Sequence, residues 1–155
     1  MQLRFKATSS TFSYTISGET INGIDLSPLE HGGQFVGNDD TKAAGIRHAE
    51  RDSSGELWVT LQQAPPITRI SFVVEGRKRP ITLSPEQIER DGDKLVLHVE
   101  QNSGKVDEGG EPVMETVEVR HTIVREIEHR DGDWTESDWI DASTYDPDAL
   151  YIKEV

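Results

Sequence analysis

The stretches ETINGIDLSPLEHGG (residues 19–33) and AAGIRHAERDSSGELWVTLQQAP (residues 43–65) decide the fold of this chain. Asn22-Gly23 separates two short runs in which apolar and polar residues alternate, and a type I′ hairpin turn favours this pair because it needs a positive φ at both central positions. Residues 57–61 repeat the alternation, which places every second side chain on one face of a strand. Both stretches therefore predict β-hairpins.

The same alternation extends in both directions from this region. It recurs in residues 2–7, 12–16, 70–74 and 95–99. We therefore predict a mainly β fold of antiparallel hairpins that form a sandwich or a barrel-like sheet body, with one or two short helical turns. The first two runs are expected to pair with each other as a hairpin.

Three further segments have distinct patterns. Ser84-Pro85-Glu86-Gln87 predicts a helical turn, because Ser84 can cap it, proline fits the first position and Gln87 completes a capping box. Residues 102–112 are rich in glycine and polar side chains and predict a flexible loop or linker. Residues 113–130 are compatible with strand or helix periodicity, and their many Val, Ile and Thr residues favour a strand.

The domain organisation follows from these patterns. We predict one antiparallel β domain over residues 1–130, with a seam near residues 63–67, where Ala64-Pro65-Pro66 stops a strand. Residues 131–155 form an acidic C-terminal segment that is also rich in aromatic residues. We expect this segment to dock on the body of the domain or on a partner, because its large apolar side chains are poorly suited to solvent. Those aromatic residues are Trp134, Trp139, Tyr145 and Tyr151.

Composition narrows the classes of partner. The net charge of −13 opposes binding to phosphate backbones, so no nucleic-acid partner is expected. Arg77-Lys78-Arg79 is the most basic run and is interpreted as a solvated hairpin tip. The chain has no cysteine, which excludes disulfides and cysteine zinc sites. It also has no apolar run long enough to cross a membrane, so no membrane partner is expected.

No pattern in the sequence predicts a catalytic site, a cofactor site or a metal site. The chain lacks the glycine-rich nucleotide-binding motifs and the G-x-S-x-G elbow of many hydrolases. Its histidines lack the spacing of zinc motifs, although neighbouring strands can bring His98 and His121 together. A metal-dependent enzyme that uses these two histidines and nearby acids therefore remains a third hypothesis.

A family resemblance supplies a biological setting. The resemblance is carried by residues 19–32, the Ala44-Gly45-Ile46 strand, Glu50-Arg51-Asp52 with Gly55-Glu56-Leu57, and Thr60-Leu61 before Ala64-Pro65. Together they resemble small uncharacterised proteins from the tail region of bacteriophages and prophages. The resemblance covers about residues 19–65 and implies a role in a phage tail or in its assembly. It implies no activity.

We therefore expect a non-enzymatic, phage-derived structural or tail-accessory protein that acts through protein–protein contacts. Its partners are expected to be copies of itself, in a homo-oligomer, or other tail components. Its expected location is the host-cell cytoplasm, either free or associated with the virion. The expected contact residues are Trp134, Trp139, Tyr145 and Tyr151, because aromatic side chains anchor interfaces. The alternative is a carbohydrate- or ligand-binding β-module that uses the same aromatic residues.

Overall fold

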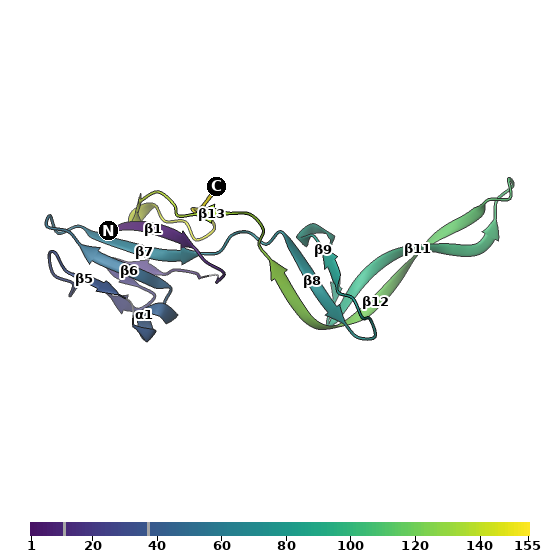
Figure 1. Cartoon of the computed structure of the whole chain (residues 1–155), viewed down its shortest axis with the longest axis horizontal. Helices are drawn as coiled ribbons and strands as arrows, with labels where there is room; N and C mark the ends of the chain where they lie inside the picture. Colours follow the sequence, from purple (N-terminus) through teal and green to yellow (C-terminus); the bar gives the residue numbers. More distant parts are fainter. Residues whose placement is uncertain (11, 37) are drawn as a thin grey trace. The chain divides into compact units, whose positions relative to one another are not determined.

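The chain forms two compact units in the computed structural model, which describes residues 1–10, 12–36 and 38–155 (Figure 1). Unit 1 combines Met1–Pro66 with Asp131–Val155, and unit 2 consists of Ile67–Arg130. The sequence predicted a different division, into residues 1–130 and 131–155. The C-terminal segment belongs to unit 1 because its strands and aromatic rings pair and pack there.

A five-stranded sheet forms the body of unit 1. Its order is β14-β1-β7-β6-β5, and only the β1–β7 pair is parallel. The prediction that residues 2–7 pair with residues 12–16 was wrong, because β1 pairs with β7 and β14 instead. The strands are β1 (Gln2–Ala7), β5 (Gln34–Val36), β6 (Ile46–Arg51), β7 (Leu57–Gln63) and β14 (Ile140–Asp141).

Smaller elements complete unit 1. The predicted Asn22-Gly23 turn is confirmed, with φ of 48° and 81°, and it joins two strands of a short meander. Helix α1 (Asp39–Ala43) is capped by Asn38, whose side-chain oxygen accepts the Thr41 N–H at 3.0 Å. The remaining elements are β2 (Ile16–Ser17), β3 (Thr20–Ile21), β4 (Ile24–Asp25), β13 (Trp134–Thr135), the 3-10 helix η2 (Ala142–Thr144) and β15 (Lys153–Glu154).

The core of unit 1 lies on one face of its sheet. Leu3 and Phe5 of β1 and Val59 and Leu61 of β7 are fully or almost fully buried, as alternation on paired strands requires. Ile152, close to the C-terminus, is buried in the same cluster. The core thus combines residues from both ends of the chain.

Unit 2 is a second five-stranded sheet, with the order β10-β11-β12-β8-β9, in which all pairs are antiparallel. Its core contains Phe72, Ile81 and Leu95. The strands are β8 (Arg69–Val74), β9 (Ile81–Leu83), β10 (Arg90–Asp91), β11 (Lys94–Val106) and β12 (Pro112–His129), with the 3-10 helix η1 (Pro85–Gln87) between β9 and β10.

Several sequence predictions are decided by these elements. The mainly β fold class is confirmed, and neither five-stranded sheet closes into a barrel among the described strands. Residues 113–129 are strand, and the capping box of Ser84 and Gln87 is present at η1. The predicted loop over residues 102–112 is shorter than expected, because β11 continues to Val106. Among the described residues, no helix has both the length and the apolar character needed to span a membrane.

Candidate functional site

The most distinctive surface of the molecule is the outer part of the β11–β12 hairpin, residues 98–118, which we call the arm. β11 and β12 pair with each other from Lys94↔Thr122 to Asn102↔Met114. β10 pairs with β11 only at its start, and β8 pairs with β12 only from Ile123 onward. The arm therefore extends as a two-stranded ribbon beyond the other strands of unit 2 (Figure 1).

The register of the hairpin gives the arm two different faces. Directly opposed residues share a face, so Leu97 and Val119 lie with Val99 and Val117 on one side. These four residues form what we call the valine stripe. The other face carries His98 opposite Glu118 and Glu100 opposite Thr116. The arm is thus an amphipathic ribbon, although residues on both of its faces are open to solvent.

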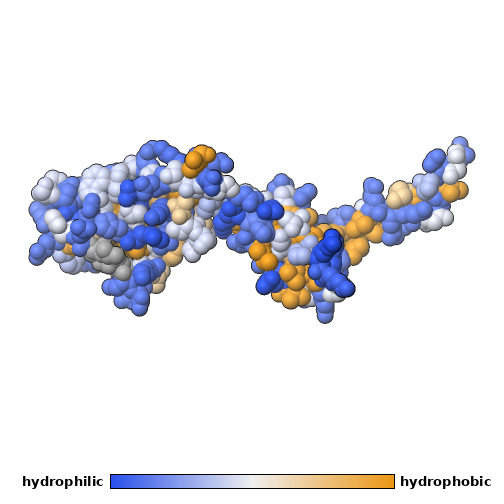
Figure 2. All heavy atoms as spheres, in the orientation of Figure 1, coloured by the Kyte–Doolittle hydropathy of each residue, from blue (hydrophilic) through white to orange (hydrophobic). Residues whose placement is uncertain are grey.

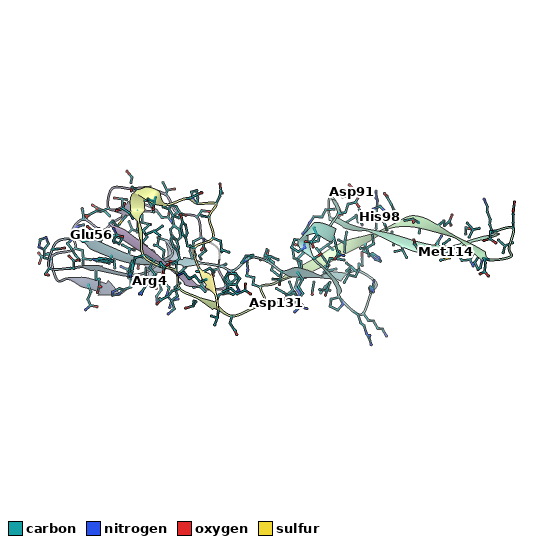
Figure 3. All side chains as sticks on the ribbon, turned by 90° about the horizontal axis from the view of Figure 1, so that it is seen from above. Arg4, Glu56, Asp91, His98, Met114 and Asp131 are labelled. Carbon is teal, nitrogen blue, oxygen red and sulfur yellow. The ribbon has the colours of Figure 1, made fainter. Side chains whose placement is uncertain are left out.

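The valine stripe continues the core of unit 2 into solvent. Leu97 packs against the buried cluster around Phe72 and Leu95, whereas Val99 is 43% exposed. Figure 2 shows orange, hydrophobic residues along part of the arm. Met114, which is 53% exposed, lies on the other face of the arm, together with His98 and Glu118. Figure 3 shows Met114 farther along the arm than His98. A partly exposed apolar stripe that leaves a core is typical of a surface that binds a partner.

The arm is strongly acidic. Residues 98–118 contain six Asp or Glu residues and one lysine, which gives a formal charge of −5. Such a charge raises the solubility of an exposed ribbon and opposes its pairing with an identical ribbon. It also attracts a basic surface.

The tip of the arm is a tight turn that its own sequence stabilises. The Asp107 carboxylate accepts the N–H groups of Gly109 and Glu111 at 2.8 and 2.9 Å. Gly110 has a φ of 81°, a conformation that glycine adopts without a steric penalty. These bonds connect the two strands across residues 107–111, so the segment predicted as a flexible loop or linker is instead the end of a strand and a tight hairpin turn.

The predicted contact residues Tyr145 and Tyr151 pack inside unit 1. Their rings stack on Phe5, with centroid distances of 5.8 and 4.7 Å. The backbone around Tyr151 is held by Gln63 of β7, whose side-chain oxygen accepts the Tyr151 and Ile152 N–H groups at 2.8 and 3.1 Å. Both tyrosines therefore help to attach the C-terminal segment to the sheet.

The two predicted tryptophans also contact unit 1. Trp134 is partly buried against the core, and its indole N–H donates to the Asp131 carbonyl at 3.2 Å. Trp139 packs edge-on against Trp58 at 5.0 Å, with the Arg4 guanidinium 4.6 Å from its ring centre. At 38% exposure, Trp139 presents the most accessible ring of the four predicted residues.

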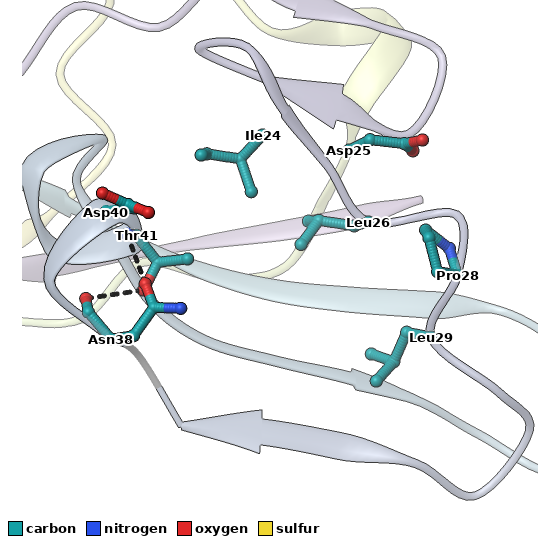
Figure 4. A pocket seen from close by; sticks show the side chains of 8 residues that line it. All are labelled: Ile24, Asp25, Leu26, Pro28, Leu29, Asn38, Asp40 and Thr41. Carbon is teal, nitrogen blue, oxygen red and sulfur yellow. Dashed lines mark hydrogen bonds between the residues drawn. The ribbon is translucent and has the colours of Figure 1, made fainter.

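A shallow hollow of about 360 Å³ lies on unit 1 between the β4 region and α1 (Figure 4). Leu26 and Leu29 contribute apolar surface to it, and Asp25 and Asp40 contribute carboxylates. The Asp25 carboxylate already accepts the Ser27 N–H at 2.9 Å. Hydrogen bonding to Ser27 lowers the pKa of Asp25, so it is ionised at neutral pH.

Glu89, His98 and Glu118 form the one cluster among the described residues in which three side chains could together hold a metal ion. His98 Nε2 lies 2.7 Å from Glu89 Oε2, and Glu118 also pairs with Arg120 at 3.2 Å. All three side chains are exposed, and the hydrogen bond between His98 and Glu89 and the ion pair between Glu118 and Arg120 account for their arrangement. His121 lies opposite Leu95, on the other face of the hairpin from His98, so the hairpin does not bring these two histidines together.

Comparison of the chain with protein-family models, with curated proteins and with solved structures found no match. The sequence did contain one signal for the arm, because the strand-like run over residues 113–129 is longer than the roughly ten residues of an ordinary strand. A strand of that length extends beyond its sheet unless the strands beside it are equally long.

Proposed function

We propose that this chain is a non-enzymatic structural or assembly protein that acts through protein–protein contacts. The observation that carries the proposal is the arm, along which the valine stripe leaves the core, with Val117 half-buried and Val99 43% exposed, and which no other strand of the described chain flanks. Soluble proteins rarely leave a continuous apolar strip on a thin ribbon without a partner, because its exposure favours aggregation.

The phage-tail setting is part of the same proposal, and the resemblance over residues 19–65 supports it. In that setting, the chain is made in the host cytoplasm and meets either other tail components or copies of itself. Projecting ribbons suit such assemblies, because a ribbon can reach a neighbouring subunit while its own domain stays folded.

The test is co-expression of the tagged chain with the products of the adjacent genes. The decisive variant trims the arm by joining Leu97 to Val119 through an Asn-Gly turn. These two residues face each other across the hairpin, so a two-residue turn can close there. We expect a neighbouring product to co-purify with the wild type and to be lost from the trimmed variant, with the thermal unfolding of both chains unchanged.

A subtler variant tests the stripe alone. Val99→Thr combined with Val117→Thr keeps the side-chain shape and the strand preference but removes the apolar contact. The matched control is Val124→Thr, on β12 outside the arm, where the valine is 66% exposed. We expect the double variant to lose the partner and the control to retain it. Retention of the partner by the trimmed chain, or the absence of any partner in the wild type, would contradict the proposal.

The alternative function, carbohydrate binding through the C-terminal aromatic residues, has less support. A sugar-stacking platform needs a ring face that is open to solvent. Tyr145 and Tyr151 use their faces to stack on Phe5, and the Trp139 ring has Arg4 over it. A change of tryptophan fluorescence on titration with sugars, lost in Trp139→Ala, would favour this alternative.

A further inference from the structure

We propose that the arm binds its partner by strand addition, at the open edge of β12, which begins at Met114 in the arm and continues to Arg120, two residues beyond it. We infer further that the added strand is amphipathic, with apolar side chains on one face and basic side chains on the other. This inference rests on the proposed function, because it specifies how the arm makes its contact.

Backbone hydrogen bonds identify which groups point out of the ribbon. In an antiparallel pair, alternate residues direct both their N–H and C=O groups toward the partner strand. Ile123 bonds inward, because its N–H donates to the Asp93 carbonyl at 2.9 Å, whereas the Thr122 carbonyl bonds outward to Glu75 at 2.9 Å. By the same alternation, Met114, Thr116, Glu118 and Arg120 point their N–H and C=O groups outward.

No strand in the described part of the chain pairs with this edge, because β8 meets β12 only from Ile123 onward. These four alternate residues together provide four N–H donors and four C=O acceptors at regular spacing along the edge. An extended peptide can satisfy them by continuing the sheet, as in other complexes formed by strand addition. The edge therefore provides the affinity, and the flanking side chains provide the selectivity.

The opposite edge of the arm is less suitable. The register of β11 shifts between Asn102 and Val106, and Gly104 has a φ of 80° within this interval. A bulge of this kind bends the strand and interrupts the spacing of its outward groups. At the other end of this edge, β10 pairs with the start of β11, and the Glu89 carbonyl accepts the Val96 N–H at 2.9 Å. The regular open stretch of β11 is therefore limited to His98–Asn102, whereas that of β12 runs from Met114 to Arg120 and is the longer one for a second strand to follow.

The side chains next to the β12 edge indicate the chemistry of the added strand. Val117 and Val119 lie on one face, where an adjacent strand would bury apolar side chains beside the valine stripe. Glu118 lies on the other face, as does Glu100, which is opposite Thr116. Arg120 also lies on that face, and its guanidinium pairs with Glu118 at 3.2 Å. Basic side chains on the part of the added strand nearer the tip of the arm, away from Arg120, would reach the two carboxylates.

Charge also argues against a second copy as the occupant. Two identical arms would bring two ribbons of charge −5 together, on chains that each carry −13. Like charges placed directly opposite each other across strands are destabilising. The acidic side chains therefore protect the open edge from self-pairing and leave it available to a basic strand.

The probe for this inference is the blocked peptide Lys-Val-Lys-Val-Lys-Val-Lys, labelled for fluorescence anisotropy and titrated with the full chain. Thr116→Pro removes an outward N–H while leaving the inward bonds to β11 in place, because proline is tolerated where a strand edge faces solvent. Asn102→Pro is the control, since Asn102 is uncharged and points outward from the opposite edge of the ribbon. Because the Asn102 side chain accepts the Gly104 N–H at 2.9 Å, the thermal unfolding of this variant is compared with that of the wild type before titration.

We expect saturable binding by the wild type that weakens as salt rises, because ion pairs near a surface are screened. Thr116→Pro should weaken it about tenfold or more, which corresponds to the loss of one or two strand-pairing bonds. Asn102→Pro should bind like the wild type. A peptide in which glutamate replaces each lysine should not bind.

Several results would overturn the inference: no binding of the lysine peptide, equal losses in the two proline variants, equal binding of the glutamate peptide, or arm-dependent dimers in sedimentation at physiological salt. The proposed function fails by a different result, namely full retention of the co-expressed partner by the trimmed chain. If trimming removes that partner while Thr116→Pro binds it like the wild type, the arm is the interface but strand addition is wrong.

Discussion

Ser137 closes the edge of the unit 1 sheet at Phe5. The Ser137 N–H donates to the Phe5 carbonyl at 2.9 Å, and the Ser137 hydroxyl accepts the Phe5 N–H at 2.9 Å. One residue of the C-terminal segment thus satisfies both backbone groups of a buried strand residue. The sheet edge at β1 is covered in this way, whereas no strand among the described residues pairs with the β12 edge of the arm.

This relationship predicts the effect of Ser137→Ala. The variant leaves the Phe5 N–H without its acceptor in a buried position, so the free energy of unfolding should fall by about 1–3 kcal/mol. Denaturant unfolding followed by tryptophan fluorescence reports this change, because Trp58, Trp134 and Trp139 all belong to unit 1. The control is Ser53→Ala at an exposed turn. Equal stability of the two variants would contradict the assigned role.

Asp52 predicts a pH dependence of stability. Hydrogen bonds from the Ser54 hydroxyl and the Trp58 indole lower the pKa of Asp52 to about 2. A folded-state pKa below the unfolded value, about 3.9, gives stability that is present in full above that value and is lost as the pH falls through the folded pKa. The wild type should therefore lose stability between about pH 4 and pH 2.

The measurement is the free energy of unfolding against pH for the wild type and for Asp52→Asn, which does not titrate. Other carboxylates with lowered pKa values, such as Glu19 beside Arg51, contribute to both curves alike. The difference between the curves therefore isolates Asp52, and it should shrink toward low pH. Parallel curves across this range would refute the prediction.

Gly45 predicts a steric effect on the core of unit 1. Its φ is 80°, and a Cβ there would lie 2.6 Å from the Tyr14 hydroxyl, which accepts the Gln62 N–H at 2.8 Å. Gly45→Ala should cost more than about 1 kcal/mol, because it adds this clash to backbone strain. Gly18→Ala is the matched control, with a φ of 58° and open space around it. Urea unfolding followed by tryptophan fluorescence should give Gly45→Ala a lower free energy of unfolding than Gly18→Ala. A lower free energy of unfolding for Gly18→Ala would exclude the clash.

Phe72 predicts where unit 2 is stabilised. Its side chain is fully buried at the centre of the unit 2 core, so Phe72→Ala should destabilise that unit by about 3–5 kcal/mol. Val124→Ala, at an exposed position, should cost less than about 0.5 kcal/mol. Hydrogen exchange of β8 and β12 amides is the suitable readout, because unit 2 contains no tryptophan or tyrosine. Unchanged exchange in Phe72→Ala would contradict this assignment.

Much of the local structure could be predicted from neighbouring residues. Asn22-Gly23 forms the expected turn because few other residue pairs accept a positive φ at both positions. Ser84 and Gln87 form the expected capping box, and the alternating runs form strands. In each case, the deciding interactions lie within a few residues of one another.

The partner of β1 could not be predicted in the same way. Leu3 and Phe5 alternate as a strand must, but alternation does not state which strand lies beside them. A hairpin with residues 12–16 was the nearest option along the chain. Parallel pairing with β7 prevails because it places Phe5 next to Leu61 and beneath Tyr145 and Tyr151 in one apolar layer. Burial across distant segments outweighs the short loop.

The candidate site shows the same division. Trp134, Trp139, Tyr145 and Tyr151 stood out in the sequence because large aromatic residues lay in an acidic segment. A sequence cannot state whether such rings face a partner or their own sheet, and here the tyrosines pack on Phe5. The valines of the arm were visible as strand residues, but their exposure depends on which strands end before them.

The sequence by itself determined that this chain turns at tight corners and runs in strands, because backbone preference resides in individual residues and their neighbours. Only the tertiary structure decided that the two ends of the chain build one unit, that Ser137 covers one edge and that the β12 edge stays open. Burial and exposure depend on what lies nearby in space, and segments far apart along the chain supply those neighbours.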